Sequence, residues 1–224
     1  MKPLIFGNTH WEERKRCFSF PMLEKDLTTE VLIVGGGMSG TLCAHVLADA
    51  GYQDITVVEG RHVATGSSRA NKGLLQVSSD TMLTEFIETL GEAPAKAFYT
   101  MCKEAMEALH ALKNRFPTGS LRGRKSLYLA TKKDHVKDLM AESLALQSIG
   151  INAGFYTGEE VKEWDDLLGY GALYVEEDLD VDPVRFIYTI TEANLQRGVQ
   201  YFEETEVDLS SLSPMRCAQK AALP

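Results

Sequence analysis

The stretch TEVLIVGGGMSGTLCAHVLADAGYQDITVVE, residues 29–59, decides the fold of this chain. It begins with an apolar, β-branched run, Thr29 to Val34, which is typical of a strand buried on both faces. A glycine cluster follows, and then apolar residues recur at helical spacing until Gly51, where a helix C-cap is expected. A second apolar run, Ile55 to Glu59, predicts another strand. Strand, glycine turn, helix and strand in about 30 residues indicate a Rossmann-type unit.

The glycine cluster fits the pattern G-x-G-x-x-G with Gly35, Gly37 and Gly40. In this pattern the first glycine allows the tight turn, the second lets the backbone approach a pyrophosphate, and the third lets the helix pack closely on the strands. The helix that starts at Met38 and Ser39 presents free N–H groups and a positive dipole end to phosphates. The pattern therefore predicts a dinucleotide site.

An acidic residue ends the second strand. Glu59 stands 59 − 37 = 22 positions after Gly37, close to the spacing of about 20 that this site requires. A carboxylate at this place accepts hydrogen bonds from ribose hydroxyls and repels a 2′-phosphate, which argues against NADP. The spacing by itself leaves both NAD and FAD open.

The next segment carries a family resemblance. Gly60 and Arg61 follow Glu59, and the stretch TGSSRANKG occupies residues 65–73. This stretch resembles the second flavin-contact loop of the D-amino-acid-oxidase-like FAD-dependent oxidoreductases, which include D-amino acid dehydrogenases, glycine oxidase and sarcosine oxidase. The resemblance implies FAD as the cofactor. The cofactor-binding residues that it and the glycine turn imply are Gly35, Gly37, Met38, Ser39, Gly40, Glu59, Gly60, Arg61, Gly66, Ser67, Ser68, Arg69, Asn71, Gly73 and Val207.

The resemblance continues along the chain to about residue 207. Residues 1–28, with Trp11, Phe18 and Phe20, are expected to form an extended arm held on a neighbouring surface by its aromatic side chains. The stretch Asp180–Pro183 resembles the V-D-P entry to a helix, and locally Asp182 is a sound N-cap with proline following it. Thr205–Val207 resembles the strand that returns to the FAD domain, where a valine backbone meets the adenine.

Alternating helices and strands fill the middle of the chain. Helices are predicted at about residues 80–90, 94–115, 132–149 and 183–197, and strands at 126–131, 153–156, 172–175 and 199–202. We expect the strand 199–202 to close the substrate region, and no regular structure after residue 208. On the helix 94–115 helical spacing predicts a buried stripe. Its members are Phe98, Met101, Cys102, Met106, Leu109 and Leu112.

The predicted fold class is α/β, a Rossmann-type FAD-binding domain with an inserted α+β substrate domain, incomplete at the C-terminus. The predicted division is an arm at 1–28, an FAD-binding region with a helical extension at 29–120, part of the substrate domain at 121–203, and a truncated return strand and tail at 204–224. Since members of the family are usually much longer, we expect an incomplete relative with impaired flavin binding. A stoichiometric flavin absorption band from the purified chain would contradict this.

The resemblance implies an oxidoreductase that oxidises the C–N bond of an amino acid or secondary amine by hydride transfer to flavin. The open alternatives are an NAD-dependent dehydrogenase and a non-catalytic remnant of the flavoprotein. No catalytic residue is nominated, because residues that bind the substrate tend to lie in the missing half. His62 falls in the cofactor loop and is a candidate to approach FAD, whereas His45, within the first helix, is expected to pack or face solvent.

Composition narrows the partners and the location. The net charge of −9 repels phosphate backbones and disfavours nucleic acid. No run approaches the roughly 18 apolar residues of a membrane span. The four cysteines show no disulfide or zinc spacing, so they predict reduced thiols, no metal and a cytoplasmic protein. The expected partner is a small amine or amino acid, and the sequence leaves the oligomeric state open.

Overall fold

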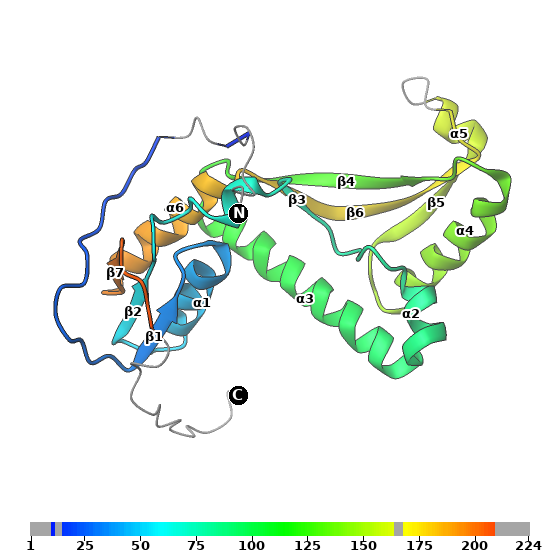
Figure 1. Ribbon diagram of the computed structural model, residues 1–224. Helices are drawn as coiled ribbons and strands as arrows, with labels where there is room; N and C mark the ends of the chain where they lie inside the picture. The colour runs from blue at the N-terminus through cyan, green and yellow to red at the C-terminus, as the bar shows by residue number, and fades with distance from the viewer. Residues whose placement is uncertain (1–9, 12–14, 164–167, 209–224) are drawn as a thin grey trace, which may run out of the picture. The chain divides into compact units, whose positions relative to one another are not determined.

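The computed structural model describes residues 10–11, 15–163 and 168–208 (Figure 1). Its contacts divide the chain into two compact units. The first contains residues 1–71 and 183–224, and the second contains residues 72–182. The tail from residue 209, for which no regular structure is predicted, lies outside the described residues. In the part of the chain that the structure describes, no helix combines the length and the apolar character needed to cross a membrane.

The first unit is built on a parallel three-stranded sheet in the order β1-β2-β7 (Figure 1). The chain runs from β1 (Val31–Val34) through α1 (Met38–Asp49) to β2 (Ile55–Val58), as predicted. Val31 pairs with Ile55, and Val34 pairs with Val58. Every residue of β2 is buried, which explains its unbroken apolar and β-branched sequence.

The third strand of this sheet comes from far along the chain. β7 (Gln200–Phe202) pairs in parallel with β2, and α6 (Pro183–Leu195) packs against α1. Both elements therefore lie in the first unit, whereas the predicted division placed them in the substrate region. Residues 205–207, which resemble a returning strand, have no regular structure. Periodicity predicts a strand but cannot tell with which strand it pairs.

The core of the first unit lies between its sheet and its two long helices. Ile33, Val57, Ile187 and Tyr201 are among its buried members. The arm adds aromatic rings to this core as expected: the ring centroids of Phe18 and Tyr188 lie 5.7 Å apart, and those of Phe20 and Tyr201 lie 5.1 Å apart.

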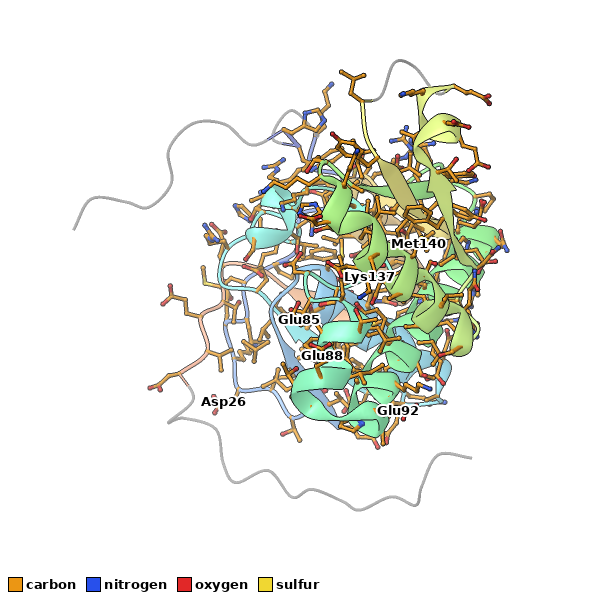
Figure 2. The ribbon with its side chains drawn as sticks, turned by 90° about the vertical axis from the view of Figure 1, so that its right-hand side faces the viewer. Asp26, Glu85, Glu88, Glu92, Lys137 and Met140 are labelled. Carbon is orange, nitrogen blue, oxygen red and sulfur yellow. The ribbon has the colours of Figure 1, made fainter. Side chains whose placement is uncertain are left out.

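The second unit is an antiparallel sheet with helices. β6 (Gly171–Val181) pairs with β3 (Leu74–Leu75), β4 (Leu121–Leu129) and β5 (Ala153–Thr157). The helices are α2 (Leu83–Leu90), α3 (Glu92–Arg115), α4 (Lys133–Ser148) and α5 (Gly158–Lys162). Figure 2 shows Glu85 and Glu88 on α2 with Glu92 at the start of α3, so acidic side chains gather where these two helices meet. The α+β character of this unit was predicted.

Two strands of the second unit are longer than predicted. β4 starts at Leu121 rather than near residue 126, and β6 extends to Val181 rather than residue 175. Many of the added residues are charged, which hid the alternation typical of strands. In the structure Asp180 accepts hydrogen bonds from Nε of both Arg122 and Arg124 on the neighbouring strand, each at 2.7 Å. Cross-strand ion pairs thus join the strands on one face, while Leu121, Leu179 and Val181 are buried.

The stripe predicted on α3 is partly wrong. Met106 is buried as expected, but the exposed fraction of Phe98 is 43% and that of Met101 is 67%. The residues that α3 buries most deeply are Ala95, Tyr99 and Met106. The buried face is therefore rotated toward Tyr99, whose ring touches those of Phe86 and Phe98 at centroid distances of 6.3 and 5.8 Å. The hydroxyl of Tyr99 excluded it from a stripe chosen by apolarity.

Candidate nucleotide site

The glycine turn lies at the corner between β1 and α1. Gly35 has a φ of 108°, a conformation that favours glycine, and its N–H donates to the Val58 carbonyl at 2.7 Å. A Cβ on Gly40 would overlap the carbonyl oxygen of Gly35, and a Cβ on Gly37 would lie 2.9 Å from Oγ of Ser68. The close helix packing ascribed to Gly40 is therefore a property of this turn. Gly37 precedes α1 and supplies no side-chain cap to it.

Glu59 directs its carboxylate at this turn. Its Oε2 accepts a hydrogen bond from the Gly36 N–H at 2.8 Å, and its Oε1 accepts one from the Arg61 N–H at 2.9 Å. The Glu59 backbone is held on both sides, since its N–H donates to Phe202 and its carbonyl accepts from Thr205. The acidic residue at the end of β2 is thus fixed beside the first turn of α1.

The loop that follows β2 folds back over the start of α1. Oγ of Ser68 accepts a hydrogen bond from the Met38 N–H at 2.9 Å, and the Ala64 N–H donates to the Gly36 carbonyl at 3.1 Å. The short 3₁₀ helix η1 (Ser67–Ala70) follows, and Trp11 of the arm donates from Nε1 to the Asn71 carbonyl at 2.9 Å. Two segments about 30 residues apart in the sequence therefore meet at one helix terminus.

The structure brings most of the predicted cofactor residues together. All of them except Gly73 lie in the first unit. Gly73 belongs to the second unit, where its carbonyl accepts a hydrogen bond from the Val181 N–H. Val207 follows β7 and is half-buried. Glu206, the residue before Val207, lies close to Gly60, since a Cβ on Gly60 would be 3.7 Å from Cγ of Glu206. Contact of these residues with a cofactor stays a prediction.

Sequence reasoning missed the polar network that fixes α1 against α6. Nδ1 of the buried His45 lies 2.9 Å from Oδ1 of Asn194, and Asn194 donates from Nδ2 to the Thr41 carbonyl and the Tyr201 hydroxyl. Burial raises the pKa of the Tyr201 hydroxyl, which keeps it neutral. An asparagine on α6 gave no sequence signal because its partners lie on other elements. His45 packs inside the protein, one of the two roles expected for it.

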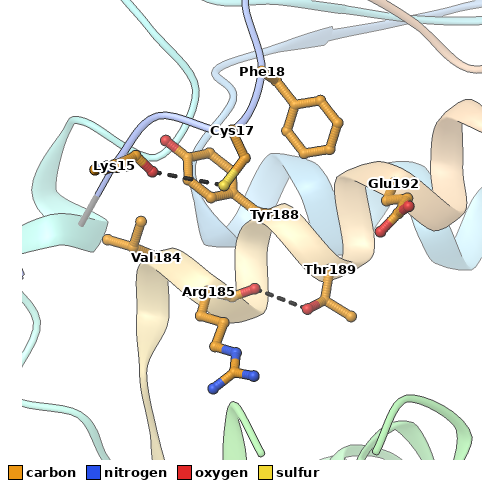
Figure 3. Close-up of a pocket in the computed structure, with 8 residues that line it drawn as sticks. All are labelled: Lys15, Cys17, Phe18, Val184, Arg185, Tyr188, Thr189 and Glu192. Atoms are coloured by element: carbon orange, nitrogen blue, oxygen red, sulfur yellow. Dashed lines mark hydrogen bonds between the residues drawn. The ribbon is translucent and has the colours of Figure 1, made fainter. Parts of the chain in front are cut away.

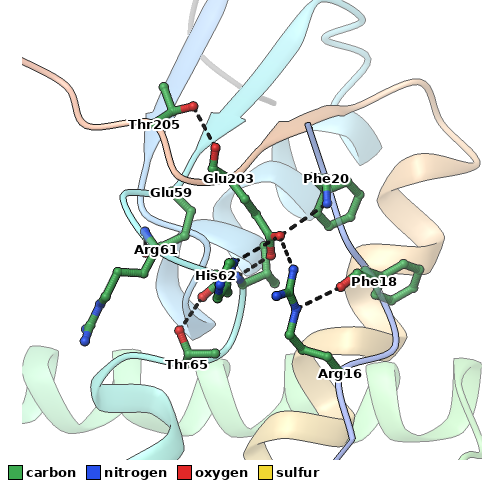
Figure 4. Close-up of polar contacts among 10 residues, drawn as sticks. Arg16, Phe18, Phe20, Glu59, Arg61, His62, Thr65, Glu203 and Thr205 are labelled. Carbon is green, nitrogen blue, oxygen red and sulfur yellow. Dashed lines mark hydrogen bonds and ion pairs between the residues drawn. The ribbon is translucent and has the colours of Figure 1, made fainter. Parts of the chain in front are cut away.

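Glu203 is a second buried acid that the sequence did not single out. It is 2% exposed and lies directly after β7. Figure 4 shows its carboxylate among Arg16, Phe20 and His62, with Nδ1 of His62 at 3.3 Å from Oε2. Glu203 begins the acidic run EETE, residues 203–206. Such a run is typical of a solvent-exposed segment, so the sequence did not indicate that Glu203 is buried.

A separate pocket of about 400 Å³ lies between the arm and α6 (Figure 3). Cys17 and Phe18 of the arm and Tyr188 of α6 are among its lining residues. The Cys17 thiol lies 3.6 Å from the Lys15 carbonyl, and Thr189 donates from its hydroxyl to the Arg185 carbonyl at 2.9 Å. The residues that line it include none of the predicted cofactor residues.

The comparisons with known proteins agree with this geometry. The model of the family described as FAD dependent oxidoreductase matches residues 30–211. The chain is 24% identical over 199 residues to YhfW of Bacillus subtilis, a putative Rieske 2Fe-2S iron-sulfur protein, covering 88% of this chain and 38% of that protein. It spans less than half of the length of this relative.

Two solved structures share the fold. L-Proline dehydrogenase from P. horikoshii superposes with a TM-score of 0.68 at 21% identity, covering 84% of this chain and 46% of that one. Glycine oxidase from Geobacillus kaustophilus superposes with a TM-score of 0.63 at 23% identity, covering 80% and 47%. The fold and the glycine corner define a protein of the Rossmann-type nucleotide-binding class. The chain belongs to the FAD dependent oxidoreductase family.

Proposed function

We propose that this chain binds the adenosine diphosphate portion of FAD at the corner between β1 and α1. The observation that carries the proposal is the Glu59 carboxylate, which lies 2.8 Å from the backbone N–H of the glycine turn. In this proposal the start of α1 receives the pyrophosphate, Glu59 receives the ribose, and the loop at residues 60–71 covers the nucleotide.

The residues at this corner fit such a group. Gly37 supplies no side-chain cap to α1, and the Met38 N–H donates to Oγ of Ser68. The next N–H groups of the first turn have no partner within the helix, which suits an anion. Each oxygen of Glu59 accepts one backbone N–H, and a carboxylate has about four acceptor positions, which leaves capacity for ribose hydroxyls. Arg61 and Arg69 lie in the covering loop, where a guanidinium can offset diphosphate charge.

We propose further that the protein containing this chain oxidises the C–N bond of an amino acid or secondary amine. The chemistry that the flavin supplies when bound is acceptance of a hydride from the carbon that carries the amine, giving an imine that water hydrolyses. Two structural neighbours, an L-proline dehydrogenase and a glycine oxidase, support this substrate class. In this proposal the residues described above bind and orient the cofactor, and none of them is assigned to the substrate site.

Cytoplasmic location is also part of this proposal. It is supported by the exposed or half-buried free thiols of Cys17, Cys43 and Cys102.

The proposal is tested by titrating the 224-residue chain separately with FAD and NAD and following intrinsic fluorescence. We expect FAD to bind more tightly than NAD, and Glu59→Gln to weaken FAD binding by about 10- to 100-fold, as expected for a hydrogen bond to a charged group. Glu30→Gln is the matched control, because it removes the same charge from an exposed side chain of the same unit. Tighter binding of NAD, or unchanged binding of FAD by the Glu59 variant, would overturn the assignment.

A further inference from the structure

The buried carboxylate of Glu203 joins three segments of the first unit (Figure 4). Its Oε1 accepts a hydrogen bond from the Val63 N–H at 2.8 Å. Its Oε2 accepts from Nη2 of Arg16 at 2.6 Å and from the Phe20 N–H at 3.2 Å. The arm, the loop after β2 and the end of β7 thus meet at one side chain.

Backbone hydrogen bonds repeat this connection. The Glu203 N–H donates to the Pro21 carbonyl at 3.1 Å, on the side of the arm. On the other side the Glu204 N–H donates to the Arg61 carbonyl at 2.9 Å, and the Thr205 N–H donates to the Glu59 carbonyl at 3.0 Å. Residues 203–205 therefore lie between the arm and the loop that starts at Glu59.

The loop that Glu203 holds is the one that contacts the glycine turn. Val63 lies against Gly36, since a Cβ on Gly36 would be 2.9 Å from Cγ2 of Val63. Its neighbour Ala64 donates to the Gly36 carbonyl. A change at Glu203 is thus transmitted through Val63 to the backbone that the proposed function assigns to the pyrophosphate.

The buried negative charge of Glu203 needs a positive partner, and Arg16 provides it. A buried carboxylate is tolerated when it is paired and its oxygens are hydrogen-bonded, and removal of one partner leaves an uncompensated charge. Nη2 of Arg16 lies 2.6 Å from Oε2 of this carboxylate, closer than Nδ1 of His62 at 3.3 Å, and the Arg16 side chain is about one-third exposed. The arm therefore supplies the charge that permits Glu203 to stay buried beneath the loop.

We propose that Arg16 and Glu203 are positioning residues of the nucleotide site, so that the N-terminal arm is a functional part of it. The pair holds residues 61–64 against the glycine turn, and FAD affinity depends on it. The identity of the ligand rests on the proposed function, whereas the link between Arg16, Glu203 and Val63 rests on their hydrogen bonds.

The test measures FAD affinity of the 224-residue chain and of Arg16→Met, Glu203→Gln and the double variant. We expect Arg16→Met to weaken FAD binding at least 10-fold, because the unpaired carboxylate moves toward water and releases Val63.

The double variant removes both charges, so its loss of FAD affinity is expected to be smaller than the product of the two single losses. Arg16→Lys is expected to restore most of the affinity. Lys15→Met, which removes the neighbouring cation of the arm, serves as the control.

Circular dichroism at the titration temperature separates positioning from unfolding, since the native spectrum is expected in every arginine variant. Equal FAD affinity of Arg16→Met and Lys15→Met, or losses that multiply in the double variant, would overturn the proposal. Hydrogen exchange of the chain without ligand gives a second readout. Arg16→Met is expected to speed exchange of the Val63 amide. If the unaltered chain binds no FAD, the proposed function fails. If Arg16→Met leaves the exchange rate of the Val63 amide unchanged, the positioning role of Arg16 and Glu203 fails, whether or not FAD binds.

Discussion

At the scale of single residues, the three glycines of the turn are not equivalent. Gly37 faces the end of a serine side chain, which can rotate away, whereas Gly40 faces the backbone carbonyl of Gly35, which cannot. A methyl group at position 40 must therefore push α1 away from β1. The turn tolerates change at its second glycine better than at its third.

We predict that Gly40→Ala lowers the free energy of unfolding by about 2 kcal/mol or more, as overpacking typically does, and abolishes saturable FAD binding. Urea denaturation and FAD titration check both effects. Gly123→Ala on β4 is the control, since the nearest atom to its Cβ is a lysine ammonium 3.7 Å away. If Gly40→Ala behaves like Gly123→Ala, the close contact at the turn is not required.

At the scale of elements, buried polar groups decide where helices start. Glu142 on α4 is 2% exposed, and its carboxylate accepts hydrogen bonds from the N–H groups of Leu83 and Thr84 and from the Thr84 hydroxyl, at 2.8 to 2.9 Å. A glutamate from a different helix thus caps α2, which has no side-chain cap from its own Met82. The cap also ties α2 to α4.

We predict that Glu142→Ala lowers the free energy of unfolding by about 3 kcal/mol, because two N–H groups and a hydroxyl lose their acceptor and a cavity remains. Glu88→Ala on the exposed side of α2 is expected to change it by less than about 0.5 kcal/mol. Chemical denaturation of both variants provides the comparison. Similar stability of the two variants would show that the cap contributes nothing.

Tyr99 of α3 gives the second unit a pH dependence. Its ring is fully buried, its hydroxyl donates to the Thr81 carbonyl at 2.7 Å, and burial raises its pKa from 10.0 to about 12. A raised pKa means that the fold favours the neutral phenol. This contribution to stability is complete below pH 10, the unfolded value, and is lost as the pH rises through about 12.

We predict that Tyr99→Phe is less stable than the unaltered chain by about 1 kcal/mol at pH 8, from the lost hydrogen bond. The difference should shrink between pH 10 and pH 12, because phenylalanine has no proton to lose. Urea denaturation across this range measures it, with Tyr128→Phe, at an exposed position, as the control. A difference that is constant up to pH 12 would contradict the assigned cause.

At the scale of the whole molecule, the first unit exposes apolar side chains on β1 and on α1. Leu32 and Val34 are 37% and 58% exposed, and Val46 is 62% exposed. α1 carries one charged side chain, Asp49, and helices that are apolar on all sides are normally buried on all sides. β1 also ends the described part of the sheet, which leaves one edge of that strand without a pairing strand among the described residues.

We predict that the 224-residue chain self-associates through these exposed apolar side chains, and that combining Val34→Lys on β1 with Val46→Lys on α1 shifts it to the monomer. Sedimentation velocity over a range of concentrations is the measurement. Leu90→Lys, at an exposed leucine of the second unit, is expected to leave association unchanged. Association that persists in the double variant would show that other surfaces are responsible.

How much the sequence predicted depends on the range of each interaction. The elements of the glycine corner and the α+β character of the second unit follow from spacings within about 30 residues. The predicted buried face of α3 was partly wrong, because a stripe chosen by apolarity left out the buried Tyr99 and included the exposed Met101. The strands β4 and β6 were predicted too short because their added length rests on Arg122, Arg124 and Asp180.

By itself, the sequence determined a strand, a glycine turn, a helix and an acidic residue at the end of the next strand, since each is encoded by its neighbours along the chain. Only the tertiary structure decided that β7 pairs with β2 and that Glu203 lies buried beside Arg16 and Val63. Glu203 is 187 positions from Arg16 and 140 from Val63. Local periodicity carries no information about contacts at that separation, because they form only when distant segments are packed together.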